Sequence, residues 1–207
     1  MVAASLVAVC AGCGGPAQSA TAQQPSSPAA RAAASAAGAA SPAAGPSGGG
    51  RQAYGTSCRP GQLRLTLGPQ VSEATQQDTA VLVLTNVSAA GCDLRGYPGL
   101  ALSGHNGAPL PFRYHRGGDQ MLTGAAPALV PLPPGAAAYF AMSKVTCVAH
   151  ERDVARRIQV TPPGGHRALS HPVRRFPTLG YCPAGDPGHI IDLTPIEPSL
   201  GDLASRH

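Results

Sequence analysis

Short runs of alternating apolar and polar residues begin after Tyr54 and recur as far as residue 193. Residues 63–67 read Leu-Arg-Leu-Thr-Leu, which is the two-residue period of a strand with one buried face. Residues 79–85 form a run of Thr, Ala, Val and Leu, which is typical of a central strand. Runs of the same kind cover residues 100–103, 110–114, 128–132, 138–142, 158–161 and 190–193.

Turn residues separate these runs and indicate how they connect. Asn106 and Gly107 lie between the third and fourth runs and predict a hairpin, because both residues tolerate positive φ. About eight short strands separated by turns predict an all-β domain, either an antiparallel sandwich or a barrel. One or two helical turns are expected only over residues 148–157, where Asp153 and Arg157 stand four apart.

The N-terminus carries the pattern of an export signal. Residues 2–9 form an apolar run interrupted only by Ser5, and the small residues Ala11 and Gly12 precede Cys13, as a lipoprotein signal peptidase requires. We therefore predict a signal peptide over residues 1–12, a lipid on Cys13 and attachment to the outer face of the cell membrane.

The same segment allows three other interpretations. A cleaved secretory peptide without a lipid is the main alternative. A transmembrane helix is disfavoured, because the apolar run is far shorter than the ~20 residues needed to span a bilayer. Cys10 and Cys13 match a redox spacing, but no βαβ pattern surrounds them.

The segment between this signal and the strand-rich region has a biased composition. Residues 14–53 consist almost wholly of Ala, Gly, Pro, Ser, Gln and Thr, which cannot bury enough apolar area to offset the entropy of ordering. We therefore expect Cys13 and a disordered tether over residues 13–53, a folded domain over residues 54–200 and a flexible tail over residues 201–207.

Four cysteines fall within the expected domain: Cys58, Cys92, Cys147 and Cys182. An even number in an exported chain indicates disulfides, and four cysteines allow three pairings, between which the sequence does not decide. We predict Cys58–Cys92 and Cys147–Cys182, each closing a loop of about 35 residues. A four-thiolate zinc site is the alternative, but such sites usually bring cysteines in close pairs, and these are widely separated.

One block of the sequence resembles the signature of a known family. Residues 84–99 read Leu-Thr-Asn-Val-Ser-Ala-Ala-Gly-Cys-Asp-Leu-Arg-Gly-Tyr-Pro-Gly, similar to an actinobacterial family of extracytoplasmic domains of unknown function. Residues 132–140, Cys147 and residues 158–164 continue the match. The resemblance implies a β-sandwich in a lipoprotein or secreted protein, and it supplies no activity. We predict an antiparallel immunoglobulin-like β-sandwich with two disulfides. From the residues themselves, Gly96 to Gly99 form a turn, with Tyr97 expected to pack inward and bond to backbone.

The sequence carries no familiar catalytic motif. The sequence lacks G-x-S-x-G, H-E-x-x-H, a P-loop and a dinucleotide fingerprint. The histidines lie in expected loops without i, i+2 or i, i+4 pairs, which is typical of surface residues. His115 and Asp119 have the residue types of a base and its orienting group, but no nucleophile can be assigned to them. The full set is His105, His115, His150, His166, His171, His189 and His207.

Charge is unevenly distributed within the domain. Residues 54–207 carry 13 basic and 10 acidic residues, which is too mild an excess to indicate nucleic-acid binding. Residues 144–175 concentrate seven basic residues against two acidic ones. Such a patch can attract anionic wall polymers or phospholipid headgroups, although a solvated surface is the simpler interpretation. Its candidate binding residues are Arg152, Arg156, Arg157, Arg174 and Arg175, with Lys144 in the same stretch.

These observations favour a non-enzymatic binding or structural domain at the cell envelope, with no cofactor. Its partner is expected to be the membrane through the lipid anchor, together with an anionic cell-wall polymer or another envelope protein. The alternative is a metal carrier or enzyme whose site is assembled from loop histidines.

Overall fold

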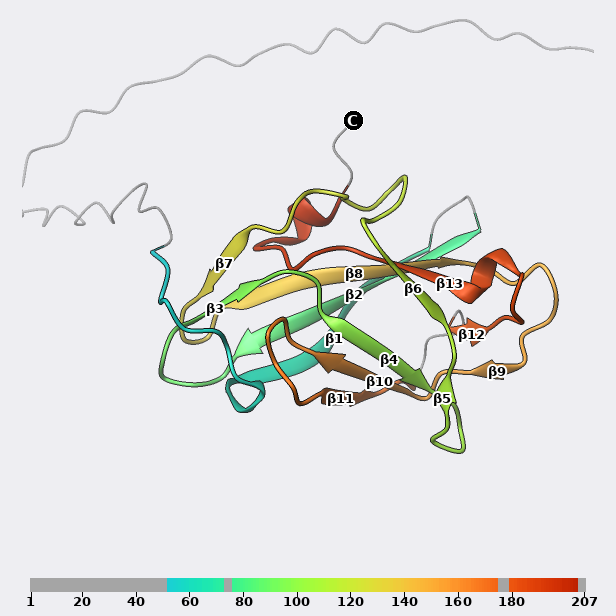
Figure 1. Cartoon of the computed structure of the whole chain (residues 1–207), viewed down its shortest axis with the longest axis horizontal. Helices are drawn as coiled ribbons and strands as arrows, with labels where there is room; N and C mark the ends of the chain where they lie inside the picture. The colour runs from blue at the N-terminus through green and yellow to red at the C-terminus, as the bar shows by residue number, and fades with distance from the viewer. Residues whose placement is uncertain (1–51, 73–75, 175–178, 205–207) are drawn as a thin grey trace, which may run out of the picture. The chain divides into compact units, whose positions relative to one another are not determined.

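The structure, a computed structural model, describes residues 52–72, 76–174 and 179–204 (Figure 1). The expected signal peptide, the lipidated Cys13, Cys10 and nearly all of the tether lie outside these residues. Within the described ranges, no helix is long and apolar enough to cross a bilayer.

The described elements are thirteen strands and three short 3-10 helices, and the expected all-β class is confirmed. In chain order they are η1 (Pro60–Gln62), β1 (Leu63–Ser72), β2 (Gln77–Asn86), β3 (Cys92–Arg95), β4 (Gly99–Ser103), β5 (Pro109–Leu110), β6 (Arg113–Arg116), β7 (Leu129–Leu132), β8 (Ala137–Val145), β9 (Asp153–Val154), β10 (Arg157–Thr161), β11 (Leu169–Pro172), β12 (Gly180–Tyr181), η2 (Pro187–His189), β13 (Ile190–Leu193) and η3 (Leu200–Leu203).

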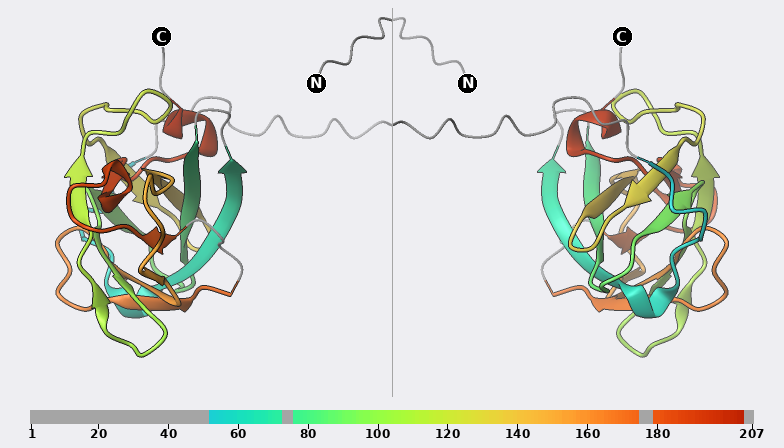
Figure 2. Two further views of the ribbon diagram at one scale, coloured as in Figure 1. Left: turned by 90° about the vertical axis from the view of Figure 1, so that its right-hand side faces the viewer. Right: turned by 90° about the vertical axis from the view of Figure 1, so that its left-hand side faces the viewer.

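Two sheets face each other and form a sandwich (Figures 1 and 2). One has the strand order β1-β2-β8-β13-β6, and the other has the order β11-β10-β4-β5. Two small ribbons, β3-β7 and β12-β9, lie toward opposite ends of the molecule in Figure 1. All pairs are antiparallel except β13 with β6, which is parallel and departs from a purely antiparallel sandwich.

The core lies between the two sheets and follows the alternation seen in the sequence. Leu82 on β2 and Phe140 on β8 meet Leu102 on β4 and Ile158 on β10 in one apolar cluster, and all four are essentially inaccessible to solvent. Burying a large apolar side chain contributes about 1.5–3 kcal/mol. This layer therefore supplies much of the force that holds the sheets together.

The run at residues 110–114 is not one strand, as the pattern predicts, but two. β5 ends at Leu110 in the four-stranded sheet, and β6 begins at Arg113 in the five-stranded sheet. Pro111 lies between them, and its lack of an N–H disfavours continuing a ladder. The next residue, Phe112, turns into the core, where its ring meets Tyr181 edge-to-face at 5.1 Å.

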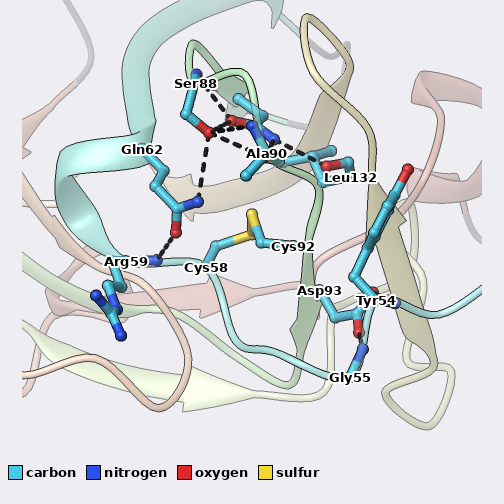
Figure 3. The surroundings of a disulfide bond; sticks show 11 residues. Tyr54, Gly55, Cys58, Arg59, Gln62, Ser88, Ala90, Cys92, Asp93 and Leu132 are labelled. Atoms are coloured by element: carbon cyan, nitrogen blue, oxygen red, sulfur yellow. Dashed lines mark hydrogen bonds between the residues drawn. A yellow bond between two sulfur atoms is a disulfide. The ribbon is translucent and has the colours of Figure 1, made fainter.

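Both predicted disulfides are present and confirm the pairing. Cys58 and Cys92 join the entering segment to β3, with Cα atoms 4.9 Å apart, as Figure 3 shows. Cys147 and Cys182 join the segment after β8 to the residue after β12, with Cα atoms 5.5 Å apart. Each bridge therefore fixes a region where regular pairing is short.

The expected helical turn over residues 148–157 is wrong. The segment is extended and contains β9, and its backbone N–H groups bond across to other segments instead of four residues back: Arg152 donates to Tyr181 and Ala155 to Leu179. The Oδ1 atom of Asp153 lies 3.8 Å from Nδ1 of His105, and the carboxylate does not pair with Arg157. Long-range backbone pairing has overridden a weak local preference.

The packed chain extends into the segment expected to be a flexible tail. Leu203 is buried against the outer face of the five-stranded sheet, and Ala204 forms a bridge with Leu122.

Asn86, from the block that carries the family resemblance, is a buried connector. Its side-chain amide donates to the carbonyls of Ala90 at 2.8 Å and Leu132 at 2.9 Å, and its oxygen accepts from the Ser88 N–H at 3.0 Å. The residue is fully buried. These bonds hold the β2–β3 connection against β7, next to the Cys58–Cys92 bridge.

Replacing Asn86 with Ala should lower the free energy of unfolding by about 2–4 kcal/mol, because it leaves buried backbone groups without partners. Urea unfolding followed by circular dichroism measures the loss. Asn106→Ala, in the exposed hairpin turn, is the control and should cost less than about 1 kcal/mol. Equal losses in the two variants would contradict the connecting role of Asn86.

Candidate functional site

The arginines predicted to bind an anion lie on the surface around β9, β10 and β11. Arg152, Arg156, Arg157 and Arg174 are all exposed, whereas Arg175 lies outside the described residues. The first four are therefore accessible to a ligand in solution.

Backbone pairing brings three of them to one end of the β10–β11 hairpin. The carbonyl of Arg156 accepts from the Val173 N–H at 2.8 Å, and Arg174 follows directly. The Arg157 guanidinium donates to the Ser170 hydroxyl at 3.1 Å. In the described part of the chain, no carboxylate lies within 4.0 Å of these guanidinium groups, so their charge is not internally neutralised.

Lys144 does not belong to this surface, which corrects the expectation for the basic stretch. It is only 2% exposed, although it is a charged residue. It stands two residues after Met142 on β8, and the alternation of the strand turns both toward the sandwich interior. Its Nζ donates to the carbonyl of Val145 at 2.8 Å.

Asp78 stands opposite Lys144 in the β2–β8 register and is also buried. Its Oδ2 has no hydrogen-bond partner among the described residues. Burial raises the pKa of the Asp78 carboxyl, and the Lys144 charge opposes that rise. Burial lowers the pKa of Lys144, against the opposing effect of Glu151, Asp78 and Asp186. The two buried groups therefore both shift toward their neutral forms.

Asp186 organises the loops beside this buried pair. Its carboxylate accepts the backbone N–H of Ala149 at 3.0 Å and that of Gly188 at 2.9 Å, and so caps η2. These bonds, with that from Ala149 the strongest influence, lower the pKa of Asp186. An ionised Asp186 thus fixes the loop that carries the Cys147–Cys182 bridge.

A second polar pair lies on the outer face of the five-stranded sheet. His115 on β6 and Asp192 on β13 are register partners, and Nδ1 of the histidine is 2.7 Å from Oδ1 of the aspartate. Burial raises the pKa of Asp192, while the hydrogen bond from His115 opposes the rise. Asp192 and not Asp119 is therefore the carboxylate beside His115, and Asp119 instead accepts backbone N–H groups in its own turn.

This pair borders a pocket of about 450 Å³ that Arg113, Val145, Pro187 and Ile190 also line. A histidine held by a carboxylate is suited to proton transfer. No hydroxyl or thiol nucleophile of Ser, Thr or Cys is among the described lining residues. The geometry therefore provides an oriented imidazole without an assigned reaction partner.

The remaining histidines do not converge. Among the described residues, no three His, Cys, Asp or Glu side chains are grouped to hold a metal ion. His189 departs from the expectation of a surface position: it is buried, with its ring 5.5 Å from that of Tyr181. His207 lies outside the described residues.

The Gly96–Gly99 segment forms a turn before β4, but Tyr97 is only half-buried. The guanidinium carbon of Arg116 lies 6.0 Å from the centre of its ring, so the expected fully inward position is not observed. Gly96 has φ of +116°, which strongly favours glycine there. Its carbonyl accepts from the Ile196 N–H at 3.0 Å, tying the turn to the segment after β13.

A comparison with family models matches residues 58–195 to the domain of unknown function DUF4232. The chain belongs to the DUF4232 family. No curated protein and no solved structure matches the chain.

Sequence reasoning missed the buried charges of this DUF4232 domain, although a signal for them exists. Asp78 is two residues before Ala80 and four before Leu82, and Lys144 is two after Met142 and four after Phe140. A strict two-residue period places both charged residues on the core face. By contrast, only the folded structure reveals that Asp192 is the partner of His115, because 77 residues separate them.

Replacing Lys144 with Met should change how the stability of the DUF4232 domain depends on pH. Because the pKa of Lys144 is lowered by folding, the unfolded chain binds its proton more tightly, and stability should rise as pH increases toward 10.5. The Lys144→Met variant should lack that rise.

Urea unfolding at a series of pH values from neutral to alkaline measures this dependence. Arg64→Met, which removes an exposed cation from β1, is the control and should keep the wild-type slope. Parallel curves for wild type and Lys144→Met would show that the buried ammonium does not set the pH dependence.

Proposed function

We propose that this protein is a lipoprotein held on the outer face of the cell membrane through Cys13, and that its domain is a non-enzymatic binding module for anionic polymers of the cell envelope. The similarity to actinobacterial extracytoplasmic domains supports the location. The exposed arginines around the β10–β11 hairpin support the class of ligand.

The two disulfides are the observation that carries the location. Every cysteine of the described domain is paired, and three of the four are buried. Structural disulfides form and persist in oxidising compartments outside the cytoplasm. The small-residue sequence before Cys13 supplies the matching export signal.

The exposed arginines are better suited to attracting a polyanion by charge than to recognising the shape of one particular molecule. The hydrogen bond between Val173 and Arg156 brings Arg174 next to Arg156 and Arg157. None of the three guanidinium groups has a carboxylate partner among the described residues. Charges of one sign that are not neutralised steer oppositely charged ligands and raise their rate of association. This steering weakens with salt, because the Debye length is about 8 Å at physiological ionic strength.

The His115–Asp192 pair and its pocket favour a second candidate function, that of an enzyme or metal carrier. A single imidazole and one carboxylate offer fewer ligands than metal sites generally use. Metal analysis of the purified full chain tests the carrier version: a stoichiometric metal lost in His115→Ala would support it over the binding module.

Removing the anchor should release the protein from the membrane. In Cys13→Ala, metabolic labelling with a fatty-acid analogue should disappear, and the protein should move from the membrane fraction to the medium. Cys10→Ala is the matched control and should keep both label and location. Persistent label in Cys13→Ala would refute the assignment of the anchor.

Neutralising the hairpin arginines should weaken binding to any anionic polymer. The Arg156→Ala, Arg157→Ala double variant should lose affinity at low salt by about tenfold, and the difference from wild type should shrink as salt increases. Fluorescence anisotropy with labelled polyglutamate measures both effects. Unchanged affinity in the double variant would rule out these arginines as the source of attraction.

A further inference from the structure

A pocket of about 640 Å³ lies between η1 and the loop that joins β10 to β11. Its first wall is the chain from Ser57 to Gln62, and its second wall includes Gly164, His166 and Arg167. This pocket lies at the end of the β10–β11 hairpin that carries the connecting loop. Arg156 and Arg157 lie at the other, open end, where β10 begins and β11 ends. It is therefore a separate feature from the arginines discussed above.

The pocket is lined by positive charge without a compensating acid. Arg59 belongs to one wall and Arg167 to the other, and His166 adds an imidazole. No Asp or Glu is among its described lining residues. Within the described ranges, neither guanidinium has a carboxylate within 4.0 Å, so both remain available to an external anion.

The first wall is held in place by a covalent bond and by side-chain hydrogen bonds. Cys58, directly before Arg59, is bonded to Cys92. The backbone N–H of Arg59 donates to the Gln62 side-chain oxygen at 2.9 Å, and the Gln62 amide donates to Ser88 at 3.3 Å. In Figure 3 the Arg59 side chain projects away from the disulfide, and no dashed line reaches its guanidinium group.

The second wall is a tight turn. The N–H of Gly165 donates to the Pro162 carbonyl at 2.9 Å, and Gly164 has φ of +74°, a conformation that favours glycine. The strands on either side of this turn are paired in the four-stranded sheet. Both walls are therefore built before any ligand arrives, which lowers the entropic cost of binding.

We propose that this pocket binds a phosphodiester group of a polyol-phosphate polymer. Guanidinium groups match phosphate oxygens through paired N–H donors. The free oxygens of a phosphodiester surround a tetrahedral phosphorus and accept hydrogen bonds from several sides, so arginines on two walls can both donate to one group. A carboxylate accepts hydrogen bonds mainly in its own plane, which is a narrower match to donors that come from two walls. This inference rests on the proposed function. It names the phosphodiester as the group that is bound, and Arg59 and Arg167 as the residues that bind it.

The test measures preference between two polymers, because preference separates the pocket from general attraction. The full chain is titrated into fluorophore-labelled poly(glycerol phosphate) and into polyglutamate of matched charge. Wild type should prefer the phosphodiester polymer by about tenfold or more, as expected for contacts worth about 1.4 kcal/mol or more in total.

Two variants locate the preference. Arg59→Ala with Arg167→Ala should bind both polymers equally, whereas Arg156→Ala with Arg157→Ala should weaken both by a similar factor and keep the ratio. Arg59→Lys with Arg167→Lys keeps the net charge but lacks the planar forks, and it should lose most of the preference. Circular dichroism melting checks that each variant folds, and the lysine variant provides the test if the alanine variant does not.

The outcomes distinguish this inference from the proposed function. A wild type that binds both polymers equally, or a preference that survives in both pocket variants, would overturn the pocket assignment and leave the binding module standing. Failure to bind either polymer would overturn both. Binding to phosphatidylglycerol vesicles without binding to poly(glycerol phosphate) would overturn the polymer as the ligand.

Discussion

The two disulfides are the constraint on which the rest of this molecule depends. Its sheets are held together by one apolar layer between them, in a chain with three Phe and no Trp. The two ends, by contrast, consist of short ribbons and loops. Each bridge closes a loop of about 35 residues and contributes roughly 3–4 kcal/mol by restricting the unfolded chain. The geometry of the loops is therefore maintained by disulfide cross-links, because the strand pairing there is short.

The arrangement of charge follows the same division between sheets and loops. Arginines stay exposed on the β10–β11 hairpin and beside Cys58, while Lys144 and Asp78 are enclosed where β8 ends and β2 begins. A buried charge is costly unless its environment compensates, and here both groups shift toward neutrality. The surface cations carry no such cost, because water solvates them until a ligand replaces it. The cations available to the proposed ligand thus lie at the surface, whereas the enclosed pair influences stability.

Sequence reasoning predicted the long strands and the disulfides but failed where pairing is non-local. Residues 79–85 and 138–142 carry enough alternation to identify β2 and β8. β3 and β11 were missed, because four-residue strands with mixed composition have little periodic signal. The extended segment around β9 was expected to be helical, because its backbone partners lie far along the chain. At the candidate sites, the exposure of the arginines could be predicted, because charged side chains usually stay in water. The pairing of His115 with Asp192 and the position of the β10–β11 loop beside Arg59 could not, because both depend on tertiary contacts.

The entry of the chain into the domain has a mechanical consequence. The segment before Cys58 is fastened to β3: the backbone N–H groups of Tyr54 and Gly55 donate to the Asp93 carboxylate, and the Cys58 N–H donates to the Asp93 carbonyl. If the chain is pulled from its N-terminal side, those bonds yield first, and the load then reaches Cys58. From there tension passes through the sulfur bridge to Cys92 and bypasses β1 and β2. Two strands of the main sheet are thereby shielded from stretching, which would suit the proposed role of a domain held at a surface while it binds a polymer.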